Sequence, residues 1–417
     1  MIGLVDGNNF YVSCERVFDL SLEGRPVAVL SNNDGCVISR SQEFKALDIP
    51  MGTPYFKLKP IMAKSGIVLK SSNYELYGDM SRRLVQILHE FAPVVEPYSI
   101  DEAFIELSIP SLDYYAYSKE IRSAILKWIG IPCGVGFAPT KTLAKIANHI
   151  GKKRPEGVFI MPADASNVLR DLTVEEVWGI GSRLGVKLRS RGIRTALQLA
   201  QADIKKLQDA FSVNVARTAL ELRGTPAVVD EDPEDLSQSV SCSRSFGYPV
   251  EDLRELEEAV SFYTASSAEK LRKEKQIAAG ANVYFQYYPE YGTSPSDGGF
   301  TSTTVAFEPP TDDTSSMLHA IRPALRGIYR EGRRYKKAGV VFFGLEPKEK
   351  PQPDLFTVAK AKPKRDGLYQ VVDEINSHHG RGAVFTLSSG IERKWAMKRG
   401  MLSPSYTTRW NSLPSAK

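Results

Sequence analysis

The first 165 residues alternate short apolar runs with longer stretches in which apolar residues recur every three or four positions. The short runs have the length of strands, and we expect strands at residues 2–5, 26–30, 36–39, 94–100, 103–107 and 134–137. The longer stretches predict helices with one buried face at residues 74–91, 114–129 and 140–152. Strands mixed with packed helices in this way are typical of an α+β domain.

The pattern changes beyond residue 165. Helical periodicity alone from about 165 to 226 predicts a small helical domain, and the acidic stretch 228–238 is typical of an exposed linker. The order that follows predicts a four-stranded antiparallel sheet with helices on one face, and it comprises strand 240–246, helix 253–273, strands 279–288 and 300–307, helix 314–330 and strand 338–345. A second linker, rich in proline and lysine, precedes a last segment whose packing the pattern does not predict.

Length and composition exclude several classes of protein. A chain of 417 residues is expected to form several domains, and 42% hydrophobic with 25% charged residues is typical of globular proteins. No apolar run approaches the roughly 20 residues of a membrane span, and Asp6 interrupts the start of the chain before the apolar core of a signal peptide could form. We therefore expect no membrane association and a cytoplasmic location. The four cysteines lack the paired spacing of a zinc site and are expected to be reduced thiols.

The positive charge is unevenly distributed. The net charge is +5, yet residues 352–417 hold 11 Lys and Arg against 5 Asp and Glu, so the remainder of the chain is close to neutral. Further basic clusters lie within residues 141–154, 183–194 and 322–337. Separate basic patches on a nearly neutral body suit a long polyanion contacted at many points, although each patch alone could be a solvated helix face.

Two features predict contacts to a phosphate backbone. Gly179 and Gly181 precede a basic helix carrying Arg183 and Lys187, as in a helix-hairpin-helix, where backbone amides at a helix start bind phosphate without reading the base sequence. The alternative is a pair of core helices capped by glycine. In the strand expected at 240–246, Ser241, Ser243 and Ser245 lie on one side and Arg244 lies on the other, and we expect a polar face able to meet a phosphate backbone.

The strongest candidate for catalysis is a set of three carboxylates. Asp6 follows one predicted strand, and Asp101 with Glu102 separates two others. Magnesium prefers oxygen ligands, and two such ions held by carboxylates from different strands can catalyse displacement at phosphorus. Adjacent residues of a regular strand point to opposite faces, so Asp101 and Glu102 converge only where the chain turns or bulges. The alternative is a solvated Asp-Glu pair at a hairpin.

The residues around these carboxylates resemble a known family. The motifs at 6–11 (DGNNFY), 98–104 (YSIDEAF) and 134–147 (GVGFAPTKTLAKIA) resemble the three signatures of the Y-family translesion DNA polymerases, in the family's order and spacing. Residues 401–404 and 406–409 are similar to the carboxyl terminus of the UmuC-type members, the catalytic subunits of bacterial polymerase V. The resemblance covers essentially the whole chain.

The resemblance implies a right-hand polymerase of α+β class that performs error-prone translesion synthesis in the SOS DNA-damage response. It implies a ferredoxin-like palm at residues 1–10 and 73–165, small fingers at 11–72 and a helix-hairpin-helix thumb at 166–230. A linker at 231–239 would lead to a β-α-β-β-α-β little finger at 240–346, followed by a linker with a clamp-binding peptide at 347–366 and a C-terminal segment at 367–417.

The family's site residues can be carried over position by position. Asp6, Asp101 and Glu102, with the backbone carbonyl of Gly7, would hold two Mg²⁺ ions. Tyr11 matches the aromatic gate that excludes a 2′-hydroxyl from the incoming deoxynucleoside triphosphate.

Three further positions would contact the nascent base pair or the triphosphate. Ile38 would roof the base pair, while Lys45 and Lys152 would bind the triphosphate. Two departures matter: Gln42 stands where many members carry tyrosine, and Lys45 stands in place of an arginine whose bidentate phosphate contact lysine does not reproduce.

The resemblance also implies partners besides primer-template DNA. Gln352, Leu355 and Phe356 match the peptide that docks bacterial polymerases on the sliding clamp, with the Leu-Phe pair filling an apolar pocket. A cleaved UmuD-type dimer and a RecA filament would complete the active assembly, with the basic C-terminal segment as their expected binding region. Two other functions remain open from the residues alone: a non-catalytic DNA-bound scaffold, which the three carboxylates disfavour, and a nucleotide cyclase, which has no use for a helix-hairpin-helix.

Overall fold

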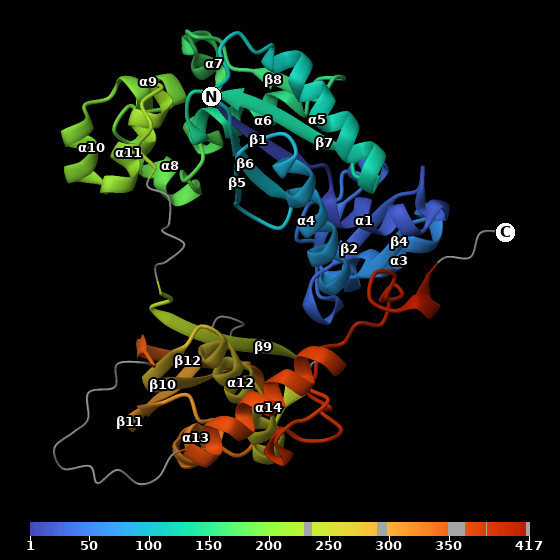
Figure 1. Ribbon diagram of the computed structural model, residues 1–417, viewed down its shortest axis with the longest axis vertical. Coiled ribbons are helices and arrows are strands. Elements are labelled where there is room, and N and C mark those ends of the chain that lie inside the picture. The colour runs from blue at the N-terminus through green and yellow to red at the C-terminus, as the bar shows by residue number, and fades with distance from the viewer. Residues whose placement is uncertain (229–235, 290–297, 349–362, 381, 414–417) are drawn as a thin grey trace. The chain divides into compact units, whose positions relative to one another are not determined.

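The computed structural model describes residues 1–228, 236–289, 298–348, 363–380 and 382–413 (Figure 1). The chain forms two compact units, one made of Met1–Glu231 together with Gly400–Lys417, the other of Asp232–Arg399. None of the helices in the described ranges combines the length and apolar character needed to cross a bilayer.

A five-stranded sheet forms the centre of the first unit. Its order is β5 (Val94–Pro97), β6 (Glu102–Glu106), β1 (Ile2–Gly7), β7 (Cys133–Ala138) and β8 (Val158–Ile160), with β1 antiparallel to both neighbours. Side chains alternate across a strand, so Val5 packs with α4 (Tyr74–His89) and α5 (Tyr114–Ile129), while Leu4 packs with α6 (Lys141–Gly151). The α+β architecture expected for this region is confirmed, and the sheet is buried on both faces.

A smaller sheet follows, in the order β3 (Val37–Arg40), β2 (Val27–Leu30) and β4 (Val68–Ser71). The predicted strands β2 and β3 form an antiparallel pair, whereas β4 pairs in parallel with β2 and was not predicted. The helices α2 (Gln42–Lys45) and α3 (Tyr55–Ser65) belong to the same region. Buried Leu30, Phe44 and Leu58 form its core.

The helix that follows β1 was missed because its start resembles a turn. The sequence Gly7-Asn8-Asn9 predicts a turn, but Asn9 adopts a left-handed conformation (φ 48°) and α1 (Phe10–Phe18) begins directly after it. Asparagine tolerates that conformation better than most residues. The helix therefore starts one residue before Tyr11.

The helical domain predicted from residue 165 is present. It comprises α7 (Ser166–Asp171), α8 (Ser182–Arg189), α9 (Ala196–Gln201), α10 (Ile204–Ala210) and α11 (Val213–Leu222). Gly179 has φ +85°, a conformation that favours glycine, and it forms the turn that leads into α8. Buried leucines, alanines and valines of these helices form a common core.

The second unit has the predicted β-α-β-β-α-β order. Its elements are β9 (Ser239–Val250), α12 (Leu253–Lys273), β10 (Gln276–Tyr287), β11 (Phe300–Thr311), α13 (Thr314–Ile328) and β12 (Tyr335–Pro347). All three strand pairs are antiparallel, in the order β11-β10-β12-β9, and Figure 1 shows α12 and α13 lying against this sheet. Their apolar side chains share one core with alternate residues of the strands.

The C-terminal segment, whose packing the pattern did not predict, is divided between the two units. The helix α14 (Pro363–His379) is held to α12 because Arg272 forms a two-pronged ion pair with Asp373. Trp395 is buried against Phe262 and Tyr263. From Gly400 onward the chain packs instead on the first unit.

Candidate active site

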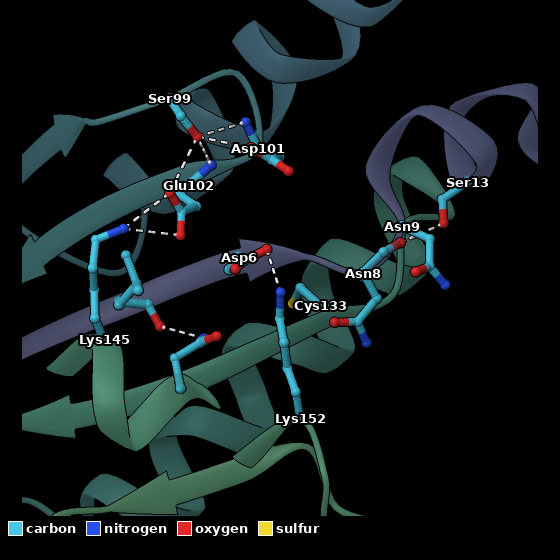
Figure 2. A network of polar contacts seen from close by, with 12 residues as sticks. Asp6, Asn8, Asn9, Ser13, Ser99, Asp101, Glu102, Cys133, Lys145 and Lys152 are labelled. Carbon is cyan, nitrogen blue, oxygen red and sulfur yellow. Dashed lines mark hydrogen bonds and ion pairs between the residues drawn. The ribbon is translucent and has the colours of Figure 1, made fainter. Parts of the chain in front are cut away.

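Strand register brings the acidic residues together. Asp6 of β1 lies directly opposite Glu102 of β6, and the amide of Gly7 donates to the carbonyl of Asp101 at 2.9 Å. Paired residues of an antiparallel ladder point to the same face, so the Asp6 and Glu102 side chains both point to the face that α6 covers. Figure 2 shows the carboxylates of Asp6, Asp101 and Glu102 around one space.

A tight turn supplies the convergence that a regular strand could not. The amides of Tyr98 and Ser99 both donate to the carbonyl of Glu102, at 3.0 and 3.1 Å. The hydroxyl of Ser99 accepts from the amide of Glu102 at 3.1 Å and donates to Oδ1 of Asp101 at 2.7 Å (Figure 2). Asp101 is thereby held outside the regular part of β6, as the sequence required.

Two lysines form ion pairs with two of the three carboxylates. Nζ of Lys152 lies 2.5 Å from Oδ1 of Asp6, and Nζ of Lys145 donates to both carboxylate oxygens of Glu102 at 3.1 Å. Lys145 also lies over the ring of Tyr98, 4.2 Å from its centroid. Both lysines come from α6 or the residue that follows it, so this helix carries the positive counterpart of the acidic set.

Burial dominates the electrostatics of Asp6. Desolvation raises the pKa of Asp6 to about 6, against the opposing effect of Lys152, and the charges of Glu102 and Asp101 raise it further. A carboxylate in this position is costly to ionise without a nearby cation. The site therefore binds positive charge favourably, and Lys152 provides it in this structure.

The donor set suits a hard divalent cation. Carboxylate oxygens and a backbone carbonyl are the ligands that Mg²⁺ prefers. In the described ranges no three His, Cys, Asp or Glu side chains lie together closely enough to hold a metal ion as they stand. The ammonium groups of Lys145 and Lys152 contact Glu102 and Asp6 instead, so binding of metal requires these lysines to shift. The metal-ligand assignment of Asp6, Gly7, Asp101 and Glu102 stays a prediction.

Tyr11 lies beside the acidic residues. Its ring stacks on Tyr77 of α4, with centroids 4.4 Å apart and planes at 15°, and Tyr74 meets its edge at 6.1 Å and 88°. Burial, with smaller effects from Tyr74 and Asp101, raises the pKa of Tyr11 to about 12. The phenol is thus neutral and firmly packed at physiological pH.

A group of cations lies near Asn9, two residues before this tyrosine. Lys45 donates to Oδ1 of Asn9 at 2.7 Å, and its pKa is lowered by burial and then by the charges of Arg40 and Lys152. Sequence reasoning missed Arg40, which shares a face of β3 with half-buried Ile38. Nη1 of Arg40 donates to the carbonyl of Ile49 at 2.6 Å, and its buried Nε has no hydrogen-bond partner among the described residues. The sequence gives one indication of Arg40: it stands two residues after Ile38, so in an extended strand the two side chains point to the same face.

The hairpin before α8 has the exposure that phosphate binding needs. Gly179, Gly181, Arg183 and Lys187 are all exposed, and a side chain added at Gly181 would meet nothing within 4 Å. Trp178 donates from its indole to the hydroxyl of Tyr98 at 3.1 Å, which connects this hairpin to the turn that carries Asp101. These features are consistent with phosphate binding by the hairpin, which stays a prediction.

Arg244 is exposed but lies on the helix-covered side of its sheet. It is paired with buried Ala338, and Nη1 donates to the carbonyl of Ser243. The open face is formed instead by Ser243, Gly339 and Tyr284, which share a register row. Tyr284 also stacks on exposed Phe300 at 5.3 Å. The clamp-peptide residues Gln352, Leu355 and Phe356 lie outside the described residues.

Comparison with known proteins agrees with this architecture. The impB/mucB/samB family profile matches residues 5–149, the C-terminal domain profile of that family matches residues 237–355, and a domain of unknown function, DUF4113, matches residues 366–416. Protein UmuC of Salmonella typhimurium is 42% identical over 428 aligned positions that cover 100% of both chains. Protein ImpB of Salmonella typhimurium is 40% identical with the same coverage. DNA polymerase IV of Bacillus velezensis is 26% identical, covering 91% of each chain.

Solved structures give the same fold. A Y-family DNA polymerase chimera of Dbh and Dpo4 superposes with a TM-score of 0.65 at 21% identity, covering 83% of this chain and 100% of the chimera. An insertion ternary complex of Dbh DNA polymerase gives 0.54 at 21% identity, with the same coverage. The 42% identity to UmuC over the full length and the two family domains in one chain show that this protein belongs to the impB/mucB/samB family, and it has the fold of the Y-family DNA polymerases.

Proposed function

We propose that this protein is a template-directed DNA polymerase that performs error-prone translesion synthesis in the SOS DNA-damage response. The observation that carries the proposal is the register of β1 and β6, which sets Asp6 opposite Glu102 and beside Asp101. Family membership, with relatives named UmuC and DNA polymerase IV, supports the same reaction.

The reaction joins a deoxynucleoside monophosphate to a primer. The primer 3′-hydroxyl gives its proton to solvent and its oxygen attacks the α-phosphorus of a deoxynucleoside triphosphate; the bond from this phosphorus to the oxygen of the β-phosphate breaks, and pyrophosphate leaves. Asp6, Asp101, Glu102 and the carbonyl of Gly7 would hold two Mg²⁺ ions at this place. When bound, such a pair stabilises charge on the attacking and leaving oxygens. Phosphoryl transfer requires little more of the protein itself than positioning of the reactants and stabilisation of the developing charge.

The basic residues give the triphosphate its binding site. Lys45 and Lys152 would contact its oxygens, and Arg40, whose charge lowers the pKa of Lys45, would add positive charge to the same group. Lys152 would exchange its contact with Asp6 for a phosphate oxygen when the nucleotide enters. Tyr11 would bar a 2′-hydroxyl by its packed ring, and Ile38 would cover the base pair.

Contacts to DNA would come from both units. The amides of Gly179 and Gly181 with the side chains of Arg183 and Lys187 would bind phosphates, and Arg244 would add a contact at the edge strand β9. Aromatic Tyr284 and Phe300 lie on the open face of that sheet. Contacts to phosphates would let the protein hold a template without reading its base sequence. Copying of damaged DNA requires such binding, because the damaged bases vary.

Accessory interactions complete the proposal. Gln352, Leu355 and Phe356 would dock on the sliding clamp, and a cleaved UmuD-type dimer with a RecA filament would join the assembly through the basic C-terminal segment. With DNA as its substrate, the protein would work in the cytoplasm.

The test is primer extension by purified protein. In magnesium, on undamaged template and on template with an abasic site, we expect the primer to lengthen, and chelation by EDTA should stop the reaction. A non-catalytic scaffold would leave every primer unchanged while still shifting DNA in a gel. An unchanged primer in magnesium, with the clamp, the cleaved dimer and RecA filament present, would refute the proposal.

A further inference from the structure

The sugar-selecting tyrosine rests on a second tyrosine that the reaction does not use. Tyr11 stacks nearly parallel on Tyr77, and Tyr77 is completely buried. Because Tyr77 supports one face of the Tyr11 ring, a shift of Tyr77 would carry over to Tyr11. A steric gate discriminates by distance, so such a shift would change the space left for a 2′-hydroxyl.

Tyr77 is fixed by a buried carboxylate. Its hydroxyl donates to Oε1 of Glu15 at 2.7 Å, and Glu15 has no exposed surface. Oε2 of Glu15 is buried without a hydrogen-bond partner among the described residues. Glu15 thus depends on a small number of donors, and each donor matters more than it would in water.

The second donor comes from the far end of the chain. The hydroxyl of Ser403 donates to the same Oε1 of Glu15 at 3.1 Å, across 388 positions of sequence. Ser403 is itself buried and accepts from Nδ2 of Asn73 at 3.0 Å. Asn73 in turn caps α4, because its Oδ1 accepts from the amide of Leu76.

The same segment also contacts the helix that carries Tyr11. Tyr406 stacks on Phe18 of α1, with centroids 4.8 Å apart and planes at 6°. Met401 exchanges hydrogen bonds with Ser71 of β4 at 3.0 and 2.9 Å. The C-terminal segment therefore touches α1 through Phe18 and Glu15, and α4 through Asn73.

We propose that residues 400–409 position the sugar gate, with Ser403 and Tyr77 as positioning residues that act on Tyr11 through Glu15. The inference rests on the proposed role of Tyr11. It assigns a task to the distal part of the region that matches DUF4113: holding α1 and α4 in the spacing at which the Tyr11–Tyr77 stack sets sugar discrimination.

The experiment measures kcat/KM for single incorporation of a deoxynucleotide and of the matching ribonucleotide, and takes their ratio. The variants are Tyr11→Ala, Tyr77→Phe, Ser403→Ala and the pair Tyr77→Phe with Ser403→Ala, all in the full-length chain. Tyr77→Phe keeps the ring and removes only the donor to Glu15. Ser405→Ala is the matched control, since Ser405 lies two residues on and its side chain is not part of this network. Circular dichroism and thermal unfolding check that each variant folds.

We expect Tyr77→Phe and Ser403→Ala each to lower the discrimination ratio by about twofold to tenfold, the range of one hydrogen bond. In the double variant the ratio should fall by less than the product of the two single effects, because both hydroxyls donate to the same oxygen of Glu15. Ser405→Ala should keep the wild-type ratio. As a second approach, Tyr406→Ala, which removes the stack on Phe18, should lower the ratio as well.

The outcomes separate the inference from the proposed function. If Tyr11→Ala lowers the ratio while Tyr77→Phe, Ser403→Ala and Tyr406→Ala keep it, the gate stands and the positioning role is overturned. A ratio unchanged in Tyr11→Ala removes the gate and the inference together. A variant that loses activity equally with both sugars has a merely structural defect, which also counts against the positioning role.

Discussion

Asp6→Asn should stabilise the protein in the absence of metal while removing its activity. Asp6 is held in the folded protein with a pKa of about 6, raised from an ordinary value of 3.8 mainly by burial. That difference in pKa corresponds to a free energy of about 3 kcal/mol, because each tenfold change in the acid dissociation constant corresponds to about 1.36 kcal/mol. Asparagine has a similar shape, keeps an oxygen that accepts from Lys152, and carries no charge to desolvate.

Proton linkage determines whether ionisation of Asp6 stabilises or destabilises the folded protein. A group whose pKa is raised on folding binds more protons in the folded state, so its ionisation weakens folding as pH rises from its unfolded pKa through its folded one. Ionisation of Asp6 should lower the free energy of unfolding by about half of its full effect at pH 5. The full effect, about 3 kcal/mol, should be reached above pH 7. The advantage of Asp6→Asn over wild type should therefore grow between pH 5 and pH 8.

The assay is thermal unfolding in EDTA at pH 5, 6, 7 and 8. In a unit of this size about 1 kcal/mol shifts the midpoint by about 2–4 °C, so the variant should melt about 6–12 °C above wild type at pH 8. Asp19→Asn is a control in which the midpoint of unfolding should change in the opposite direction, because hydrogen bonds from Ser21 and Lys70 lower the pKa of Asp19. That variant should be less stable than wild type near neutrality. An Asp6→Asn protein that melts below wild type at pH 8, or whose advantage does not grow with pH, would refute the reasoning.

Three further predictions concern the nucleotide, its sugar and the clamp. Arg40→Ala should raise KM for deoxynucleotides about tenfold by removing a positive charge that lies near Lys45, and exposed Lys57→Ala should not; equal KM values in a single-incorporation assay would exclude Arg40 from the triphosphate site. Tyr11→Ala should increase ribonucleotide incorporation, and an unchanged sugar ratio would place the gate elsewhere. Replacing Leu355 and Phe356 with alanine should remove stimulation by the sliding clamp and keep basal extension, whereas equal stimulation of both proteins would disprove the docking peptide.

Periodicity predicted most of the regular elements because their buried faces are encoded locally. The helices α5 and α12 begin and end at the predicted residues, and the β-α-β-β-α-β order of the second unit is confirmed. The helix α1 was missed because Asn8 and Asn9 favour a turn, and the pattern does not show that Asn9 turns directly into a helix. The helix α3 escaped notice because Pro60 lies inside it.

The sequence names the residues of the candidate site, but it does not give their contacts. Asp6, Asp101 and Glu102 stand in motifs, whereas the β1–β6 register that joins them is a tertiary fact. Lys152 was expected to bind phosphate, and its ion pair with Asp6 was not foreseen. The contact of Ser403 with Glu15 joins residues 388 positions apart, and no local pattern predicts it.

The proposed reaction requires Asp6, Asp101 and Glu102 to act together in nucleotidyl transfer. The most direct measurement is single-nucleotide incorporation in magnesium by Asp101→Ala beside wild type, with DNA binding and thermal unfolding measured on the same samples. Loss of a metal ligand worth several kcal/mol should reduce the rate to about one thousandth or less while DNA affinity stays near that of wild type. A folded Asp101→Ala protein that incorporates nucleotide at the wild-type rate would contradict the account.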